Sequence, residues 1–331
     1  MTVKDSQGNT MDQAFNLTMS IRTDSDIPIH LTTDDVIKFT RYTDHATRLI
    51  RHENYYGRLL EDDDAHLDKI WNLKFNDTNE TNGNLNYVAW VVSNCNTTPG
   101  AKERLKYGNL LIDAGLKLDG YGECFKGKKT DHGYKLDRGF HSNVKWLEVL
   151  SKYKFYLAFE NGIHCNGYIS EKFWRNALKV FTVPVVFGPH KDDVKKIAPP
   201  YSYIHAEDFK TPKDLVNYLE YLNKNKTAYM EYHNWRVNIK PDMTIPTEDT
   251  IKKRLCGTCR KLKEKRAQGY PIRMIKSVTS WWWMNLHDEK CTDPNKIPKF
   301  LKKISPPVSM EENWWDELRR GKRWYEKILG I

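Results

Sequence analysis

The chain of 331 residues lacks a long hydrophobic run, since no stretch approaches the ~20 apolar residues that a membrane-spanning helix requires. Its first ten residues, MTVKDSQGNT, are polar from the second position onward, so no secretory signal sequence is visible. The composition also excludes wholesale disorder, because 39 % of the residues are hydrophobic and 12 % are aromatic. We therefore expect a soluble, folded protein, and its length favours two domains.

Acidic residues are too few to balance the basic ones. Lys and Arg number 53 and Asp and Glu number 43, which leaves a formal net charge of +10. Such an excess suits nucleic acid, an anionic membrane surface or a phosphorylated substrate. The charge by itself leaves all three classes of partner open.

Cysteines and glycosylation sequons together favour the secretory pathway. The even number of cysteines permits disulfide bonds without requiring them, and N-x-[ST] sequons are used only in that pathway. Because no signal sequence is visible, we expect that the protein has a further N-terminal segment. The six cysteines are Cys95, Cys124, Cys165, Cys256, Cys259 and Cys291, and the five sequons begin at Asn16, Asn76, Asn79, Asn96 and Asn225.

From residue 87 onward, apolar runs alternate with segments of helical periodicity. This alternation predicts a mainly parallel sheet that is covered by helices on both faces, and such sheets bind ligands at the carboxyl ends of their strands. The predicted strands are 87–94, 116–124, 154–161, 182–189 and 201–209, and the predicted helices are 101–115, 170–181 and 211–225.

The most informative stretch is FYLAFENGIHCNGYISEKFWRNALKVFTVPVVFGP, residues 155–189. A strand brings Glu160 and Asn161 to its carboxyl end, and a loop with Tyr168 leads to Glu171 and Lys172 in the first turn of a helix. A lysine at a helix N-terminus favours a phosphate-sized anion, and the adjacent carboxylate is suited to stabilise a developing cation. The alternative interpretation is an ordinary capped helix with a solvated Glu–Lys pair.

The ordered motifs FYLAFENG, YISEKFWRNAL, TVPVVFGP and YSYIHAEDF resemble the α1,3-fucosyltransferase family of inverting glycosyltransferases, glycosyltransferase family 10. FNLTMSIRTDSDI, AWVVSNC, RLKYGNLL, YGEC, YHNWR and CGTC occur in the same order as in that family. The resemblance covers about residues 15–260.

This resemblance implies a GT-B type α/β fold, in which two Rossmann-like lobes face each other across a cleft. Under this interpretation residues 1–140 form the N-terminal acceptor-side lobe and residues 141–250 the lobe that binds GDP-fucose. Residues 251–331 form a basic, Trp-rich and irregular C-terminal extension, which we expect to pack against the lobes or to contact the acceptor.

The resemblance also assigns roles to individual residues. Arg104 and Lys172 would bind the diphosphate of GDP-fucose, and Tyr168 would pack on the donor or hydrogen bond to it. Glu171 is the catalytic candidate, because it would face the fucose ring where the oxocarbenium-like transition state gains positive charge. Four further residues would line the donor pocket, namely Ser93 and Asn94 on an N-lobe strand, and Glu160 and Asn161. Glu160 has the alternative role of structural partner to a nearby N–H.

The expected substrates are GDP-fucose and an N-acetylglucosamine unit of a glycoprotein or glycolipid glycan, without cofactor, metal or nucleic acid. In the family a glutamate upstream of the FNLT block serves as general base, but residues 1–14 contain only Asp5 and Asp12 as carboxylates. Either the chain is truncated or it lacks its base, and truncation would also account for the missing membrane anchor of a Golgi enzyme. The alternative function is a catalytically silent relative that binds GDP-fucose or a glycan.

Two other features resemble metal sites. Asp24-Ser25-Asp26 has the form of a DxD motif, but it belongs to the family's DSD block and we expect no metal there. Cys256 and Cys259 have the spacing of zinc ligands, whereas the secretory compartment favours disulfides. They remain unpaired or one of them bonds to Cys291, and no partner is assigned to Cys95, Cys124 or Cys165.

Overall fold

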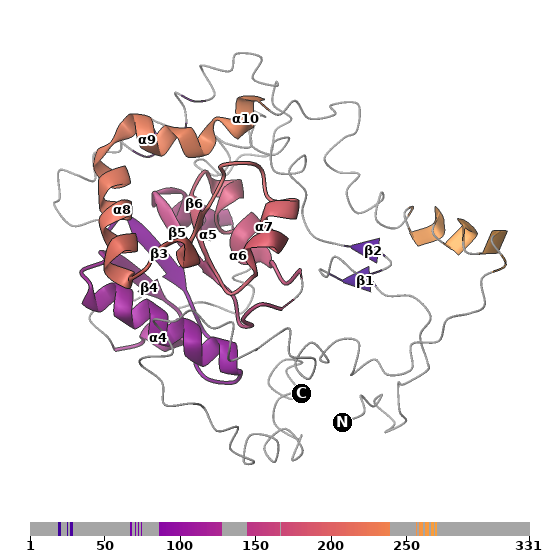
Figure 1. Cartoon of the computed structure of the whole chain (residues 1–331), viewed down its shortest axis with the longest axis horizontal. Coiled ribbons are helices and arrows are strands. Elements are labelled where there is room, and N and C mark those ends of the chain that lie inside the picture. Colours follow the sequence, from indigo (N-terminus) through magenta and orange to yellow (C-terminus); the bar gives the residue numbers. More distant parts are fainter. Residues whose placement is uncertain are drawn as a thin grey trace.

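Figure 1 shows the computed structural model of the chain. The structure describes residues 19–20, 25, 27–28, 67, 70, 72, 74, 86–127, 144–165, 167–238, 256, 258–260, 262–264, 266–267 and 269. All statements below concern these residues.

A parallel sheet of five strands in the order β4-β3-β5-β6-β7 forms the centre of the described structure (Figure 1). The chain runs from β3 outward to β4 and then returns to β5 on the other side of β3, so the strand order reverses between β3 and β5. In open parallel sheets this reversal marks the point where ligands bind. The strands are β3 (Val88–Val91), β4 (Leu118–Tyr121), β5 (Phe155–Phe159), β6 (Val183–Phe187) and β7 (Ile204–His205).

Helices cover both faces of the sheet, and the alternation of side chains along β5 shows why. Phe155, Leu157 and Phe159 point into one core with helices α4 (Pro99–Asp113), α8 (Pro212–Lys224) and α9 (Lys226–Met230). Tyr156 and Ala158 point into a second core. Both sets are fully buried, so β5 is a central strand. The second core is covered by α5 (Val144–Ser151), α6 (Glu171–Trp174), α7 (Lys191–Ile197) and α10 (Trp235–Asn238).

Short elements complete the described structure. A two-stranded parallel pair, β1 (Met19–Ser20) and β2 (Ile27–Pro28), lies apart from the main sheet (Figure 1). Within the described residues, no helix has both the length and the apolar character needed to cross a membrane. The 3-10 turns are η2 (Glu123–Phe125), η4 (Leu178–Val180), η5 (Ala206–Asp208) and η6 (Glu231–His233).

The predicted α/β class with a parallel sheet is confirmed, α8 lies within one residue of its predicted ends, and α4 begins and ends two residues earlier than predicted. The Thr98 side chain caps α4 by accepting a hydrogen bond from the Ala101 N–H. Thr211 and Asp214 form a reciprocal capping box at the start of α8, with Pro212 at its first position. Local sequence signals therefore suffice to define these two helices.

The helix predicted over residues 170–181 is wrong in its length. Helix α6 ends at Trp174 after four residues, and the segment continues as a turn and the 3-10 turn η4. Most side chains of this segment are buried, and Asn176 donates a hydrogen bond to the Tyr156 hydroxyl on β5. Burial on nearly every side, rather than helical periodicity, sets the backbone here.

The predicted boundary between lobes at residue 140 divides the sheet and needs correction. Strands β3 and β4 were expected in an N-terminal lobe, whereas β3 is hydrogen-bonded to β5 and β4 to β3. Residues 86–127 therefore fold with the segment that was predicted as the donor-binding lobe. The predicted second lobe and most of the predicted C-terminal extension fall outside the described residues.

A disulfide bond joins the carboxyl ends of β3 and β4. Cys95 follows β3, Cys124 lies in η2 after β4, and their Cα atoms are 5.5 Å apart. The two cysteines are 29 residues apart in the sequence, so no local pattern predicts their bond. They meet because the parallel strands β3 and β4 end at the same edge of the sheet. Cys165 is also disulfide-bonded, to a partner outside the described residues. Cys256 and Cys259 are free and exposed, so the predicted alternative of a bond to Cys291 is wrong.

The disulfide predicts a specific loss of stability. Replacing both Cys95 and Cys124 by alanine should lower the free energy of unfolding by about 2–4 kcal/mol, because the unfolded chain gains loop entropy. Denaturant unfolding followed by circular dichroism measures this change. The matched control is the pair of free cysteines, since Cys256→Ala with Cys259→Ala should change stability by less than about 0.5 kcal/mol. Equal stability of all three proteins would contradict the prediction.

Candidate functional site

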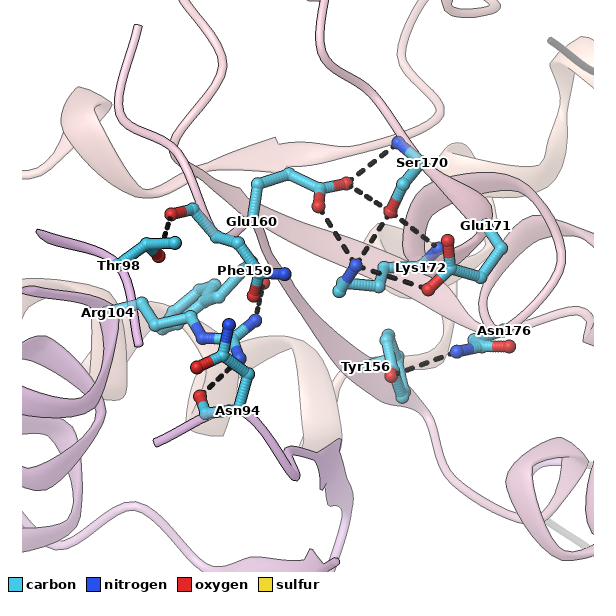
Figure 2. A network of polar contacts seen from close by, with 11 residues as sticks. Asn94, Thr98, Arg104, Tyr156, Phe159, Glu160, Ser170, Glu171, Lys172 and Asn176 are labelled. Carbon is cyan, nitrogen blue, oxygen red and sulfur yellow. Dashed lines mark hydrogen bonds and ion pairs between the residues drawn. The ribbon is translucent and has the colours of Figure 1, made fainter. Parts of the chain in front are cut away.

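The predicted site residues lie at the carboxyl edge of the sheet, around the reversal between β3 and β5, and Figure 2 shows Asn94, Arg104, Glu160, Glu171 and Lys172 among them. Ser93 and Asn94 follow β3, and Glu160 and Asn161 follow β5. Arg104 reaches the same edge from α4, while Tyr168 precedes α6, and Glu171 and Lys172 lie in its first turn.

Arg104 bridges the two strand ends at the reversal point. Its Nη1 donates to the Phe159 carbonyl at 2.9 Å, and its Nη2 donates to the Asn94 carbonyl at 2.8 Å. The side chain is only 2 % exposed. Burial lowers the pKa of Arg104 from its ordinary value, and the Glu160 carboxylate opposes that shift. The guanidinium therefore provides a positive charge that is held rigidly between β3 and β5.

The N-terminus of α4 is docked against the chain that follows β5. The Thr98 hydroxyl donates to the Asn161 carbonyl at 2.8 Å. A Cβ atom on Gly100 would lie 2.2 Å from the same carbonyl oxygen, so this position requires glycine. This close approach fixes α4, and with it the direction from which Arg104 enters the site.

Two buried polar atoms at this edge have no hydrogen-bond partner among the described residues. One is the donor Nε of Arg104, and the other is the acceptor Oδ1 of Asn161. Buried polar groups are almost always paired in folded proteins. Each of these two atoms therefore lacks the partner that its burial normally requires.

Glu160 holds the start of α6. Its Oε1 accepts hydrogen bonds from the Ser170 N–H at 2.8 Å and the Ser170 hydroxyl at 2.6 Å, and its Oε2 accepts from Lys172 at 3.0 Å (Figure 2). The residue is 1 % exposed. These contacts correspond to the alternative role predicted for Glu160, that of a structural partner to a nearby N–H.

Lys172 lies between two carboxylates. Its ammonium donates to Glu160, to the Ser170 hydroxyl at 2.8 Å and to Glu171 at 3.2 Å. Burial disfavours the charged form, but Glu160 and Glu171 outweigh that effect and raise the pKa of Lys172 above its ordinary value. The ammonium is therefore permanently charged, and its side chain keeps 12 % of its surface exposed.

Glu171 is the carboxylate of this group that faces solvent. Its side chain is 44 % exposed. Burial of part of the residue favours the protonated form, but Lys172 outweighs that effect and lowers the pKa of Glu171. An ionised, accessible carboxylate can stabilise a developing positive charge, and it is poorly suited to donate a proton as a general acid.

Tyr168 and the β3 residues complete the edge. Burial, followed by the charge of Glu160, raises the pKa of Tyr168 to about 12, so its hydroxyl stays a hydrogen-bond donor. Ser93 is exposed, as expected for a residue that lines a ligand site. The Asn94 side chain instead accepts a hydrogen bond from the Thr97 N–H, and its carbonyl binds Arg104.

The comparison with protein families decides which family this architecture belongs to. The model of the C-terminal part of glycosyltransferase family 10 (fucosyltransferase) matches residues 82–281. The chain belongs to glycosyltransferase family 10. The predicted family resemblance is thereby confirmed, and the match spans all five strands of the sheet and every candidate residue.

Individual relatives cover most of this chain. It is 34 % identical over 272 residues to the Homo sapiens protein 3-galactosyl-N-acetylglucosaminide 4-alpha-L-fucosyltransferase FUT3. It is 35 % identical over 272 residues to the Pongo pygmaeus protein 4-galactosyl-N-acetylglucosaminide 3-alpha-L-fucosyltransferase FUT6. Each alignment covers 82 % of this chain and 59 % of the relative, so the chain spans less than two thirds of their length. A crystal structure of alpha1,3-fucosyltransferase with GDP is 21 % identical with a TM-score of 0.43, over 75 % of this chain and 70 % of that one.

Sequence reasoning missed three residues that organise the site of this family 10 protein. Thr98 and Gly100 dock α4, and Ser170 links Glu160 to Lys172. Ser170 has a local signal, because serine is a preferred residue at the N-cap of a helix. The contacts of Thr98 and Gly100 bridge about sixty positions of the sequence and have no such signal.

Ser170 should contribute more to stability than an ordinary helix cap. Ser170→Ala removes a cap together with two hydrogen bonds to buried charged groups, so we expect a loss of about 1–3 kcal/mol in the free energy of unfolding. The matched control is Thr211→Ala, which removes an exposed cap from α8 and should cost about 1 kcal/mol. Denaturant unfolding of both variants measures the difference, and a smaller loss for Ser170→Ala contradicts this account.

Proposed function

We propose that this chain carries the donor-binding part of an inverting α1,3-fucosyltransferase, which transfers L-fucose from GDP-fucose to N-acetylglucosamine in a glycoprotein or glycolipid glycan. Membership of family 10 supports the reaction class. The names of the relatives, which are N-acetylglucosaminide fucosyltransferases, support the acceptor class. The observation that carries the proposal is the cationic edge of the sheet, where Arg104 bridges the ends of β3 and β5 and the Lys172 ammonium is held at the start of α6.

A sugar nucleotide matches this set of groups chemically. The diphosphate presents acceptor oxygens and negative charge, which Lys172 complements by direct contact and the enclosed Arg104 by its charge. Sugar hydroxyls present donors, one of which Asn161 Oδ1 can accept. Tyr168, whose hydroxyl stays protonated, adds a donor for a phosphate oxygen. In this proposal the two side-chain cations provide the charge compensation for the leaving diphosphate.

The proposed transfer is a single displacement at the anomeric carbon of fucose. The acceptor oxygen forms a bond to this carbon while the bond from the carbon to the β-phosphate oxygen breaks, and GDP leaves with the bonding electron pair. The hydroxyl proton passes to a general base. Positive charge develops on the sugar ring, and the ionised Glu171 carboxylate stabilises it from the edge of the site.

The proposed compartment is the Golgi lumen, with a membrane anchor in the full-length protein. The Cys95–Cys124 disulfide supports this proposal, because such bonds persist in oxidising compartments. The sequon at Asn96 adds support, since its side chain is exposed beside this disulfide.

Donor binding should depend on the charge of Lys172. Lys172→Ala removes a charge-assisted partner of the diphosphate, which we expect to weaken GDP binding roughly 10- to 150-fold by isothermal titration calorimetry. Lys196→Ala is the matched control, because Lys196 is an exposed lysine on α7 and its loss should leave GDP affinity unchanged. If Lys172→Ala binds GDP as tightly as the unaltered protein, the donor site is misplaced.

Turnover should separate Glu171 from the binding residues. Glu171→Gln keeps the shape of the side chain but removes the charge that stabilises the transition state, so kcat should fall far more than GDP affinity. Release of GDP that depends on an N-acetylglucosamine acceptor is the assay. GDP binding without transfer by the unaltered protein would instead support the silent, donor-binding alternative.

Two sequons within the described residues, at Asn96 and Asn225, should differ in whether they carry a glycan. Asn96 is exposed, whereas Asn225 caps α9 by accepting from the Ala228 N–H at 3.1 Å and donates to the Tyr221 hydroxyl at 3.0 Å. In protein secreted from eukaryotic cells, we expect Asn96→Gln to remove one glycan by mass spectrometry and Asn225→Gln to remove none. A glycan on Asn225 together with an unmodified Asn96 contradicts this assignment.

A further inference from the structure

We propose that Glu160 is a positioning residue of this site, which touches neither donor nor acceptor and acts by holding the Lys172 ammonium and the first turn of α6 in place. The inference rests on the proposed function, since it assigns Lys172 to the diphosphate. It replaces the direct donor contact that sequence analysis predicted for Glu160.

The hydrogen bonds of Glu160 leave little room for a ligand. Within the described residues, the two carboxylate oxygens accept three hydrogen bonds, all of them from Ser170 or Lys172. With 1 % of its surface exposed, the side chain is enclosed by its own structure. A ligand at this edge therefore reaches Lys172 or Glu171 before it reaches Glu160.

Glu160 is attached to the most rigid part of the fold. It directly follows β5, and its N–H donates to the Phe187 carbonyl at the end of β6 at 2.9 Å. Gly188 has a φ of +116°, and a Cβ atom there would lie 3.0 Å from the Glu160 Cβ. Glycine at position 188 thus lets β6 end this close to Glu160. The carboxylate is held by two central strands.

The carboxylate connects this rigid edge to the first turn of α6, whose later residues Phe173 and Trp174 are packed in the second core. Ser170 lies ten positions after Glu160, and α6 comprises only Glu171–Trp174, so the helix itself provides little preorganisation. The bonds from Glu160 to Ser170 and Lys172 span the loop between β5 and α6. They determine where the Lys172 ammonium and the adjacent Glu171 carboxylate lie relative to Arg104.

Charge makes this contact specific to a carboxylate. A buried ammonium needs a paired anion, and a partner that is removed leaves an uncompensated charge. Glu160→Gln retains an acceptor for Ser170 but presents an uncharged amide to Lys172. The positive charge of the ammonium then loses its buried counter-ion. Of the described carboxylates that pair with Lys172, the more exposed Glu171 would then remain, and it would draw the ammonium toward itself.

A double-mutant cycle on GDP affinity tests whether Glu160 acts through Lys172. We expect Glu160→Gln to weaken GDP binding at least fivefold, Lys172→Met to weaken it more, and the double variant to bind as Lys172→Met does. If the double variant binds GDP more weakly than Lys172→Met by the full factor measured for Glu160→Gln alone, the two residues act independently. In that case Glu160 contacts the donor itself. Unchanged or tighter binding by Glu160→Gln also overturns the proposal.

Steady-state kinetics provide a readout that a general loss of stability would not give. Glu160→Gln should raise KM for GDP-fucose and leave KM for the acceptor unchanged, because the displaced Lys172 and Glu171 side chains both face the donor in the proposed function. Glu160→Asp keeps the charge but shortens the side chain, so it should fall between the unaltered protein and Glu160→Gln. Equal increases in both KM values would assign Glu160 to the overall fold and overturn the positioning role.

Unfolding measurements without ligand distinguish this inference from the proposed function. If the unaltered protein does not bind GDP, the proposed function fails. The pairing of Glu160 with Lys172 is still tested by the free energies of unfolding of the variants. Each single variant should then be destabilised, and Glu160→Gln with Lys172→Met should lose less than the sum of the two. Additive losses overturn the pairing, and single variants that unfold while the double variant folds support it.

Discussion

The buried ion pair between Glu160 and Lys172 is the interaction on which the candidate site depends. A carboxylate and an ammonium are costly to bury separately, so each requires the other, and Ser170 satisfies the remaining hydrogen bonds. Because Glu160 follows a central strand and Lys172 begins a short helix, the pair joins the rigid sheet to the segment with exposed chemistry. The exposed Glu171 is positioned as a consequence, since it is the neighbour of both Ser170 and Lys172.

The order of the strands supplies the second constraint. Because the strand order reverses between β3 and β5, the chain leaves these two neighbouring strands in different directions. Arg104 donates hydrogen bonds to one backbone carbonyl at the end of each strand. The Cys95–Cys124 disulfide holds the loop after β3 on its other side. A buried cation, a disulfide and a buried ion pair thus converge on one edge of the sheet.

Much of this architecture could be predicted from local patterns. Buried parallel strands appear as continuous apolar runs such as FYLAF and VPVVF, and the caps at Thr98 and Thr211 follow from their own neighbours. The predictions were less accurate where packing overrides periodicity, as in the helix that ends at Trp174. They also misplaced β3, because strand pairing across the predicted boundary at residue 140 has no local signature.

The sequence by itself determined the family, the α/β class and the residue types that gather at the site. Motif order and hydrophobic periodicity can be read from the sequence without the tertiary structure. The tertiary structure alone decided how those residues are used. It showed Glu160 paired with Lys172, Arg104 bonded to two backbone carbonyls, and Cys95 joined to Cys124. Each of these contacts connects positions that are brought together only when parallel strands align their carboxyl ends at one edge.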